Sequence, residues 1–134
     1  MTRTREELLD EGWQDVKDGT FIDHMGSVFA RGLGELGILT QPCHQNLSGI
    51  VHGGVLMTAF DRVMGMLPRN LRPGEQFPTT TMTIEFLRPV KVGEFIHLTA
   101  SITKAGPRAL FVRGMARVGD RDIGAASAVF MAVT

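Results

Sequence analysis

Residues 46–66 read NLSGIVHGGVLMTAFDRVMGM, and the rest of the chain is arranged around this stretch. After two glycines, apolar residues return at α-helical spacing, at Val55, Leu56, Ala59, Phe60, Val63, Met64 and Leu67. The opposite stripe is thinly polar and holds Asp61. Pro68 follows, and we expect it to stop the helix. The pattern therefore predicts one central, mostly buried helix that begins at Gly53.

The start of this helix is bare, because Gly53 and Gly54 have no side chains to cover its first amides. Such amides have no acceptor within the helix and carry the positive end of its dipole, which suits an anion or a polarised carbonyl oxygen. Asp61 lies two turns further on, about 12 Å along the axis from Gly53. Both groups must approach one reacting atom to within about 3 Å, so one helix cannot supply both. Two antiparallel copies across a two-fold axis can, which predicts a site shared by two subunits.

The segments around the helix predict an antiparallel sheet. From Thr79 onward the apolar period changes to two, and turn sequences divide the segment into four strands that we expect to form a meander. Residues 27–41 predict two short strands broken at glycines, and residues 5–17 predict an amphipathic helix capped by Thr4. One long helix and such a sheet make an α+β fold, with the sheet wrapped around the helix. We expect residues 1–134 to form a single domain, with residues 1–20 as an N-terminal helical extension.

Composition excludes several classes of protein. The formal net charge is zero, with 14 basic and 14 acidic residues, which argues against a nucleic-acid-binding protein. No apolar run reaches the length of a membrane span, and no export signal precedes the first helix, so we expect a cytoplasmic protein. Cys43 is the only cysteine, and its sequence neighbour His44 would point elsewhere, so we expect no thiol catalysis. The histidines lack metal-ligand spacing, and neither a metal nor a cofactor is expected.

The chain resembles the hotdog-fold acyl-CoA thioesterases, most closely the branch of the phenylacetate-pathway thioesterase. The resemblance is carried by Asn46, the triplet His52-Gly53-Gly54, Asp61 and the strand from Thr79 to Pro89, and it covers about residues 20–134. It implies a hotdog fold, an acyl-CoA substrate, and a homodimer as the minimal unit, assembled further into a homotetramer.

The resemblance also implies roles for individual residues. Asp61 matches the carboxylate that acts as general base on water or as nucleophile, and these two roles stay open. Gly53 matches the residue whose amide polarises the thioester carbonyl. Asn46 matches a polar residue near the carbonyl or the water, although a turn-forming Asn is the alternative. Thr79 matches a hydroxyl that holds the water or the carboxylate, although Thr is also an ordinary strand residue. His52 is expected to orient the Gly-Gly turn by hydrogen bonding or to touch the substrate.

The substrate would need further contacts. We expect Gly54 to allow close approach of the substrate, and four basic residues are candidates to bind the phosphates of CoA: Arg88, Lys91, Lys104 and Arg108. Arg62 departs from the family pattern and would contact a partner subunit or a substrate carboxylate, so the acyl preference stays open. A non-catalytic acyl-CoA-binding module is the alternative function, but a binder needs no carboxylate beside the carbonyl.

Overall fold

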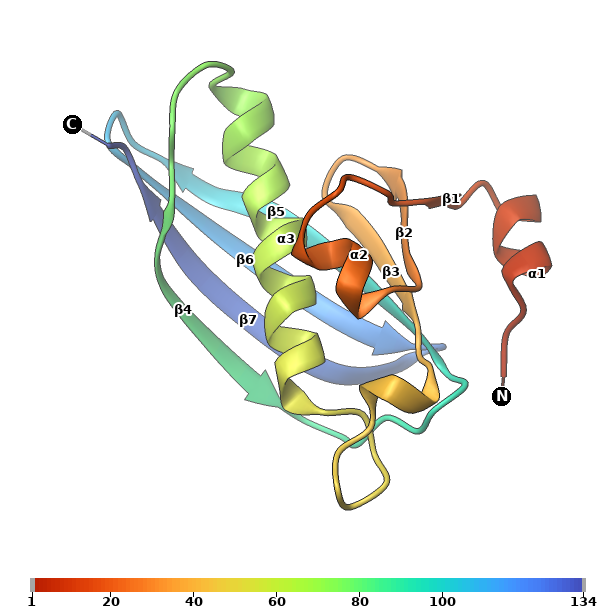
Figure 1. Cartoon of the computed structure of the whole chain (residues 1–134). Helices are drawn as coiled ribbons and strands as arrows, with labels where there is room; N and C mark the ends of the chain where they lie inside the picture. The colour runs from red at the N-terminus through yellow and green to blue at the C-terminus, as the bar shows by residue number, and fades with distance from the viewer. Residues whose placement is uncertain (1, 134) are drawn as a thin grey trace.

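The computed structural model describes residues 2–133 (Figure 1). Within this range a single long helix, α3 (Gly53–Leu71), lies across a seven-stranded antiparallel sheet. The other helices are short: α1 (Arg5–Asp10), α2 (Phe21–Met25) and a 3-10 turn, η1 (Pro42–His44). The predicted α+β fold, with the sheet wrapped around one central helix, is confirmed.

The sheet has the strand order β1-β2-β3-β5-β6-β7-β4, and every neighbouring pair is antiparallel. Its strands are β1 (Gln14–Asp15), β2 (Val28–Gly32), β3 (Glu35–Leu39), β4 (Thr79–Phe86), β5 (Phe95–Ala105), β6 (Ala109–Val118) and β7 (Arg121–Met131). The two short strands predicted within residues 27–41 correspond to β2 and β3. The four strands predicted after Thr79 correspond to β4–β7.

The predicted four-strand meander is wrong in the placement of β4. Strands β5, β6 and β7 do follow one another as a meander, but β4 pairs with β7 at the edge of the sheet, with Thr83 opposite Ser127. The position beside β5 is occupied by β3, with Leu36 opposite Leu98. Residues 87–94 therefore cross from one part of the sheet to another rather than forming a tight turn.

The prediction that Pro68 stops the central helix is also wrong, because α3 continues to Leu71. Pro68 lies only one turn from the helix end, and its carbonyl accepts the amide of Arg72 at 3.0 Å. A proline in this position removes one helical hydrogen bond. Its ring is buried in return, which offsets part of that cost.

Two glycines of the sheet allow the helix to approach closely. The ring of Phe60, fully buried on α3, lies against Gly114 of β6 and Gly124 of β7, where added Cβ atoms would lie 2.9 Å and 3.4 Å from ring atoms. At these two positions the aromatic ring packs directly on the sheet backbone, beside the other apolar side chains through which α3 packs on the sheet. Phe60 directly precedes Asp61 on α3, so this close contact lies beside the carboxylate.

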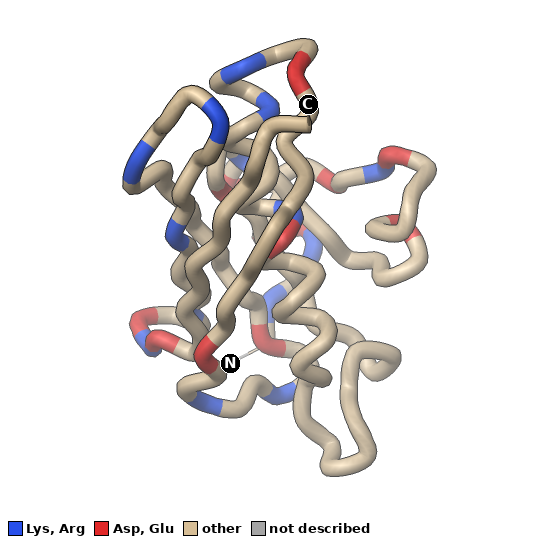
Figure 2. Tube along the Cα trace, turned by 90° about the vertical axis from the view of Figure 1, so that its left-hand side faces the viewer, with Lys and Arg blue, Asp and Glu red and all other residues tan. Residues whose placement is uncertain are grey.

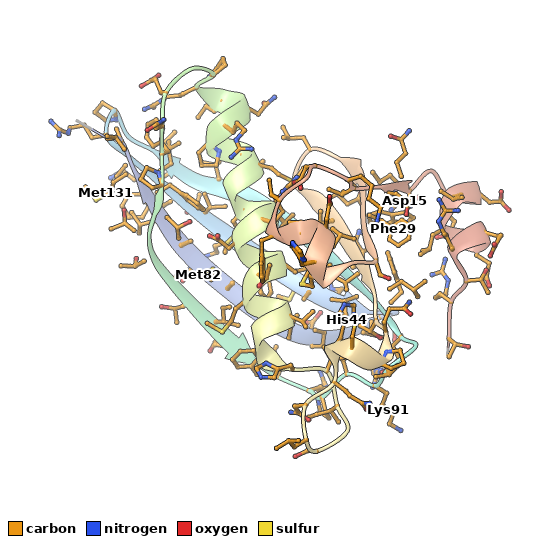
Figure 3. All side chains as sticks on the ribbon, in the orientation of Figure 1. Asp15, Phe29, His44, Met82, Lys91 and Met131 are labelled. Atoms are coloured by element: carbon orange, nitrogen blue, oxygen red, sulfur yellow. The ribbon has the colours of Figure 1, made fainter. Side chains whose placement is uncertain are left out.

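The N-terminal segment differs from the predicted helix over residues 5–17. Thr4 caps α1 as expected, by accepting the amide of Glu7, but the helix ends at Asp10 because Gly12 takes a positive φ of 93°. Trp13 is then buried on the opposite side of the sheet from α3, with its ring 5.2 Å from that of Phe95. Figure 3 shows Phe29 and Asp15 at the end of the sheet that lies next to α1. Phe29 belongs to the hydrophobic cluster around Trp13.

Gly37→Ala is expected to destabilise the fold by about 1–3 kcal/mol, because a Cβ at this position of β3 would overlap the ring of Phe95. Urea unfolding followed by tryptophan fluorescence measures the change, since Trp13 packs on the same ring. Gly32→Ala is the matched control, because its Cβ would have no neighbour closer than 3.8 Å. Equal stability of the two variants would contradict this packing.

None of the helices in residues 2–133 is long and apolar enough to cross a membrane.

Candidate active site

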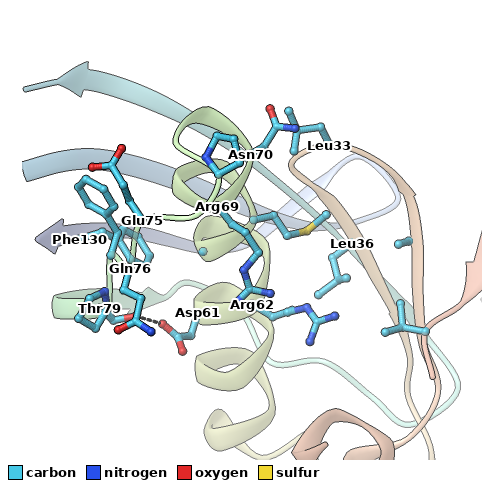
Figure 4. Close-up of a pocket in the computed structure, with 17 residues that line it drawn as sticks. Leu33, Leu36, Asp61, Arg62, Arg69, Asn70, Glu75, Gln76, Thr79 and Phe130 are labelled. Atoms are coloured by element: carbon cyan, nitrogen blue, oxygen red, sulfur yellow. Dashed lines mark hydrogen bonds between the residues drawn. The ribbon is translucent and has the colours of Figure 1, made fainter. Parts of the chain in front are cut away.

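Asp61 and Thr79 meet although they lie on different elements. Asp61 lies in the middle of α3, and Thr79 is the first residue of β4 (Figure 4). The Thr79 hydroxyl donates a hydrogen bond of 2.5 Å to Asp61 Oδ1. Among the residues that the structure describes, Asp61 forms no ion pair. The carboxylate is therefore oriented by a neutral donor while its charge stays uncompensated.

Asp61 differs in one respect from the sequence prediction, which placed it on a mostly buried helix. In the single chain the Asp61 side chain is exposed, as is Met57 one turn earlier. The buried face of α3 is the one that meets the sheet, and Asp61 lies off that face. Its carboxylate can thus be reached by a solute or by another protein surface.

A groove of about 980 Å³ opens beside Asp61 and Thr79 and follows the C-terminal half of α3 (Figure 4). Its apolar lining comes from the helix, the β2–β3 hairpin, the 72–78 loop and the sheet, and includes Leu33, Leu36, Met66, Phe77 and Phe130. Its polar lining comprises Arg62, Arg69, Asn70, Glu75 and Gln76. The carboxylate thus lies next to a space large enough for an organic group, with apolar walls.

The start of α3 carries one free amide. His52 caps the helix, and its Nδ1 accepts a 2.8 Å hydrogen bond from the Gly54 amide, so the predicted contact at the Gly-Gly turn is present. No hydrogen bond among residues 2–133 uses the amide of Gly53. The ring of Phe86 lies beside Gly53, since an added Cβ would be 3.3 Å from it. The Gly53 amide, at the positive end of the helix dipole, is therefore available to donate a hydrogen bond, whereas the Gly54 amide already donates to His52.

Asn46 shapes the loop before the helix. Its side-chain oxygen accepts the amides of Ser48 at 2.9 Å and Ile50 at 3.3 Å. This is the turn-forming arrangement that the sequence left as an alternative. The side-chain amide group has no partner among the described residues, so it remains free to donate.

The four basic candidates do not come together within one chain. Arg88 and Lys91 lie between β4 and β5, near the start of α3, where the Val51 amide donates to the Val90 carbonyl at 2.8 Å. Lys104 and Arg108 flank the β5–β6 turn at the other end of the sheet. Figure 2 shows basic positions on several separate loops of the trace. Arg88 also donates to the Asp122 carbonyl at 2.7 Å.

Two histidines outside the helix start, His44 and His97, have structural partners. His44 is buried, accepts the Gln41 amide at 2.9 Å and lies 2.7 Å from the Met25 carbonyl (Figure 3). His97 pairs with Glu35, whose pKa is held below its usual value mainly by the hydrogen bond from Arg31. No group of three or more His, Cys, Asp or Glu residues in the described part of the chain could hold a metal ion.

Sequence reasoning missed the arginines of the groove as a pair. Arg62 donates a 2.6 Å hydrogen bond to Asp18, so its partner lies within the same chain. Arg69 was not singled out at all. Their spacing could have indicated that they lie together, because Arg62 and Arg69 are seven residues apart and such residues lie on nearly the same face of a helix.

The comparisons with known proteins identify the family of this fold. The sequence model of the thioesterase superfamily matches residues 48–125, which is more than half of the chain and includes α3 and the strands β4, β5 and β6. The chain belongs to the thioesterase superfamily. It is accordingly a thioester hydrolase with a hotdog fold, as predicted.

Three relatives illustrate the similarity. A candidate esterase of Pseudomonas aeruginosa, PA0474, is 25% identical over 128 residues, which cover 91% of this chain and 96% of that protein. Mouse acyl-coenzyme A thioesterase 13 is 34% identical over 68 residues, covering 51% of this chain and 49% of that protein. The Bacillus halodurans protein BH2602, solved with CoA, superposes with a TM-score of 0.68 at 25% identity, covering 75% of this chain and 67% of that one.

Proposed function

We propose that this thioesterase hydrolyses acyl-CoA to a free carboxylic acid and CoA, with Asp61 as the residue that activates the attack. One observation carries the proposal: the Asp61 carboxylate forms no ion pair within residues 2–133, is held by Thr79 at 2.5 Å, and faces a groove of about 980 Å³. The CoA bound to the Bacillus relative and the name of the mouse relative support CoA as the thiol component.

Two routes through Asp61 balance chemically. As general base, the carboxylate takes a proton from water while the water oxygen adds to the thioester carbon; the C–S bond then breaks, and the CoA thiolate recovers a proton. As nucleophile, the carboxylate displaces the thiolate to form an anhydride, which water then cleaves. In both routes the bond from Thr79 to Oδ1 fixes the carboxylate and leaves Oδ2 to react. After a single turnover in ¹⁸O-water, label in the Asp61 carboxylate identifies the anhydride route with water attack on the Asp61 carbonyl, whereas label in the product acid alone is compatible with both routes.

The carbonyl oxygen needs a donor, and the free Gly53 amide fits that role. Because Gly53 and Asp61 are about 12 Å apart along α3, the amide would come from a second subunit. Asn46 and His52 would enter the same composite site beside it, together with Gly54, whose lack of a side chain leaves room for substrate. Large apolar side chains lie exposed around this end of the helix, as expected of a surface that a second subunit covers: Leu47, Met57, Phe86 and Leu87.

The CoA end would extend toward the start of α3. Arg88 and Lys91 lie at that end of the sheet and are proposed to contact the nucleotide phosphates. Lys104 and Arg108 lie at the far end and would reach the same CoA only from another subunit. We extend the proposal to residues 1–134 acting as one domain, to a homodimer that assembles into a homotetramer, and to a cytoplasmic location, which the free Cys43 thiol suits.

The acyl-CoA reaction is tested with phenylacetyl-, benzoyl-, hexanoyl- and palmitoyl-CoA, by following release of the free thiol. Hydrolysis of at least one of them supports the proposal and begins to define the acyl group. Tight binding of all four without thiol release would instead favour the alternative, a non-catalytic acyl-CoA-binding module.

Thr79→Val is expected to lower kcat about 10- to 100-fold, because the Asp61 carboxylate loses the donor that orients it. Thr79→Ser keeps a hydroxyl and should retain most of the activity. Thr80→Val is the matched control on the same strand, since its exposed side chain has no hydrogen bond among the described residues. Equal activity of the Thr79→Val and Thr80→Val variants would remove Thr79 from the site.

A further inference from the structure

Two arginines line the groove beyond Asp61, and only one of them is neutralised. Arg62 donates to Asp18 at 2.6 Å. The pKa of Asp18 is lowered to about 2, first by the Thr20 hydroxyl and then by Arg62. A lowered carboxyl pKa keeps this pair charged as the pH falls from neutrality and releases it only near pH 2. Asp18 therefore occupies Arg62 and ties the N-terminal segment to α3.

Arg69 has no such partner. None of the ion pairs or hydrogen bonds among residues 2–133 involves its guanidinium, although the side chain lines the groove. The acidic groups on the same groove are Asp61, which Thr79 holds, and Glu75 on the 72–78 loop, and neither forms an ion pair with Arg69. Five donors in a planar fork thus remain available beside apolar walls.

The position of Arg69 along α3 determines which part of a bound acyl group it can contact. Its Cα lies about 12 Å along the axis from that of Asp61, since eight residues separate them. Side chains on a helix lean toward its N-terminus, and Figure 4 shows Arg69 extending back toward the turn that carries Arg62. Its charged end therefore lies closer to Asp61 than its backbone does, within reach of a short acyl chain.

We infer that the groove accepts acyl groups bearing a second carboxylate at their far end, and that Arg69 binds this carboxylate. The inference rests on the proposed acyl-CoA hydrolysis and names its substrate class: CoA monothioesters of short dicarboxylic acids, of the succinyl, glutaryl and adipyl kind. The walls Leu36 and Met66 contact the methylene chain, and the guanidinium pairs with the terminal carboxylate in a bidentate manner.

The test compares acyl groups of equal length with and without the terminal carboxylate: adipyl- against hexanoyl-CoA, and glutaryl- against pentanoyl-CoA. Wild type is expected to prefer the diacid of each pair by about tenfold or more in kcat/KM. Arg69→Met should lose that preference, because its kcat/KM for the diacid should fall at least about tenfold further than its kcat/KM for the matched monoacid. Arg69→Lys should keep part of it, and Arg113→Met, an exposed arginine on β6 outside the groove, should keep all of it.

Two outcomes overturn the inference. If Arg69→Met lowers hydrolysis of both members of a pair equally, the arginine does not recognise the tail. If Arg69→Met lowers both members equally with CoA but leaves the N-acetylcysteamine thioesters, which lack the nucleotide, unaffected, Arg69 binds a CoA phosphate instead.

Failure of the proposed function looks different, because wild type would then release thiol from neither member of any pair. In that case calorimetric titration with free adipate and hexanoate still decides the inference. Tighter binding of adipate that Arg69→Met abolishes upholds the carboxylate site, and equal binding of the two acids rejects it.

Discussion

Asp61→Asn is expected to lower kcat for thioester hydrolysis by about 10²–10⁴, because an amide can neither take a proton from water nor attack the carbonyl. The substitution preserves shape, and the amide oxygen can still accept the hydrogen bond that Thr79 donates to Oδ1. The fold should therefore stay intact. Release of free thiol from the best substrate of the panel gives kcat, and thermal unfolding checks the fold.

Asp10→Asn is the matched control for this prediction, because Asp10 is an exposed residue of α1 on the opposite side of the sheet from the groove. It should hydrolyse the substrate at the wild-type rate. An Asp61→Asn enzyme that keeps its activity within a few-fold of this control would show that the carboxylate takes no part in the chemistry.

Gly53→Pro is expected to lower kcat by about 10²–10³, because proline removes the amide that is proposed to stabilise the developing oxyanion. Gly53 is the first residue of α3, where proline is well tolerated since the amide has no helical acceptor. The preceding residue, His52, already has φ −62° and ψ 136°, a conformation that is compatible with a following proline. The His52 cap on the Gly54 amide is also kept.

Gly53→Ala separates the lost donor from the added bulk. It brings the same Cβ toward the Phe86 ring at 3.3 Å but retains the amide. We expect the alanine variant to keep most of its activity and the proline variant to lose it, with similar unfolding temperatures. Equal losses in the two variants would assign the effect to crowding at Phe86 and would exclude the amide from the mechanism.

The central helix was predictable because its signal is local. The helical spacing from Val55 to Leu67 identifies the buried face, and the structure buries those residues against the sheet. The placement of β4 was not predictable from its own sequence, because the alternation over Thr79–Phe86 is the same whichever strand lies beside it. In the structure β3 pairs with the edge of β5 that β4 would use in a four-strand meander, and β4 pairs with β7 instead. The partner of β4 therefore depends on the arrangement of the whole sheet.

The candidate site also combines features that the sequence predicts with features that depend on the whole fold. The family resemblance identifies both Asp61 and Thr79 from the sequence. Their proximity, however, depends on the fold, because the first residue of β4 lies beside the middle of α3. The exposed position of Asp61 was missed, because helical spacing defines the face toward the sheet but not what covers the other faces. The Arg62–Asp18 pair joins residues 44 positions apart, and no local pattern in the sequence indicates it.

Mixing the two inactive variants tests most directly the claim that one site is built from Asp61 of one subunit and Gly53 of the other. An Asp61→Asn subunit paired with a Gly53→Pro subunit contains one doubly defective site and one intact site. Coexpression that forms mixed dimers at random is therefore expected to restore about a quarter of the wild-type activity per subunit. If the mixture stays as inactive as the separate variants, although mixed dimers are present, the two residues do not act across the subunit interface.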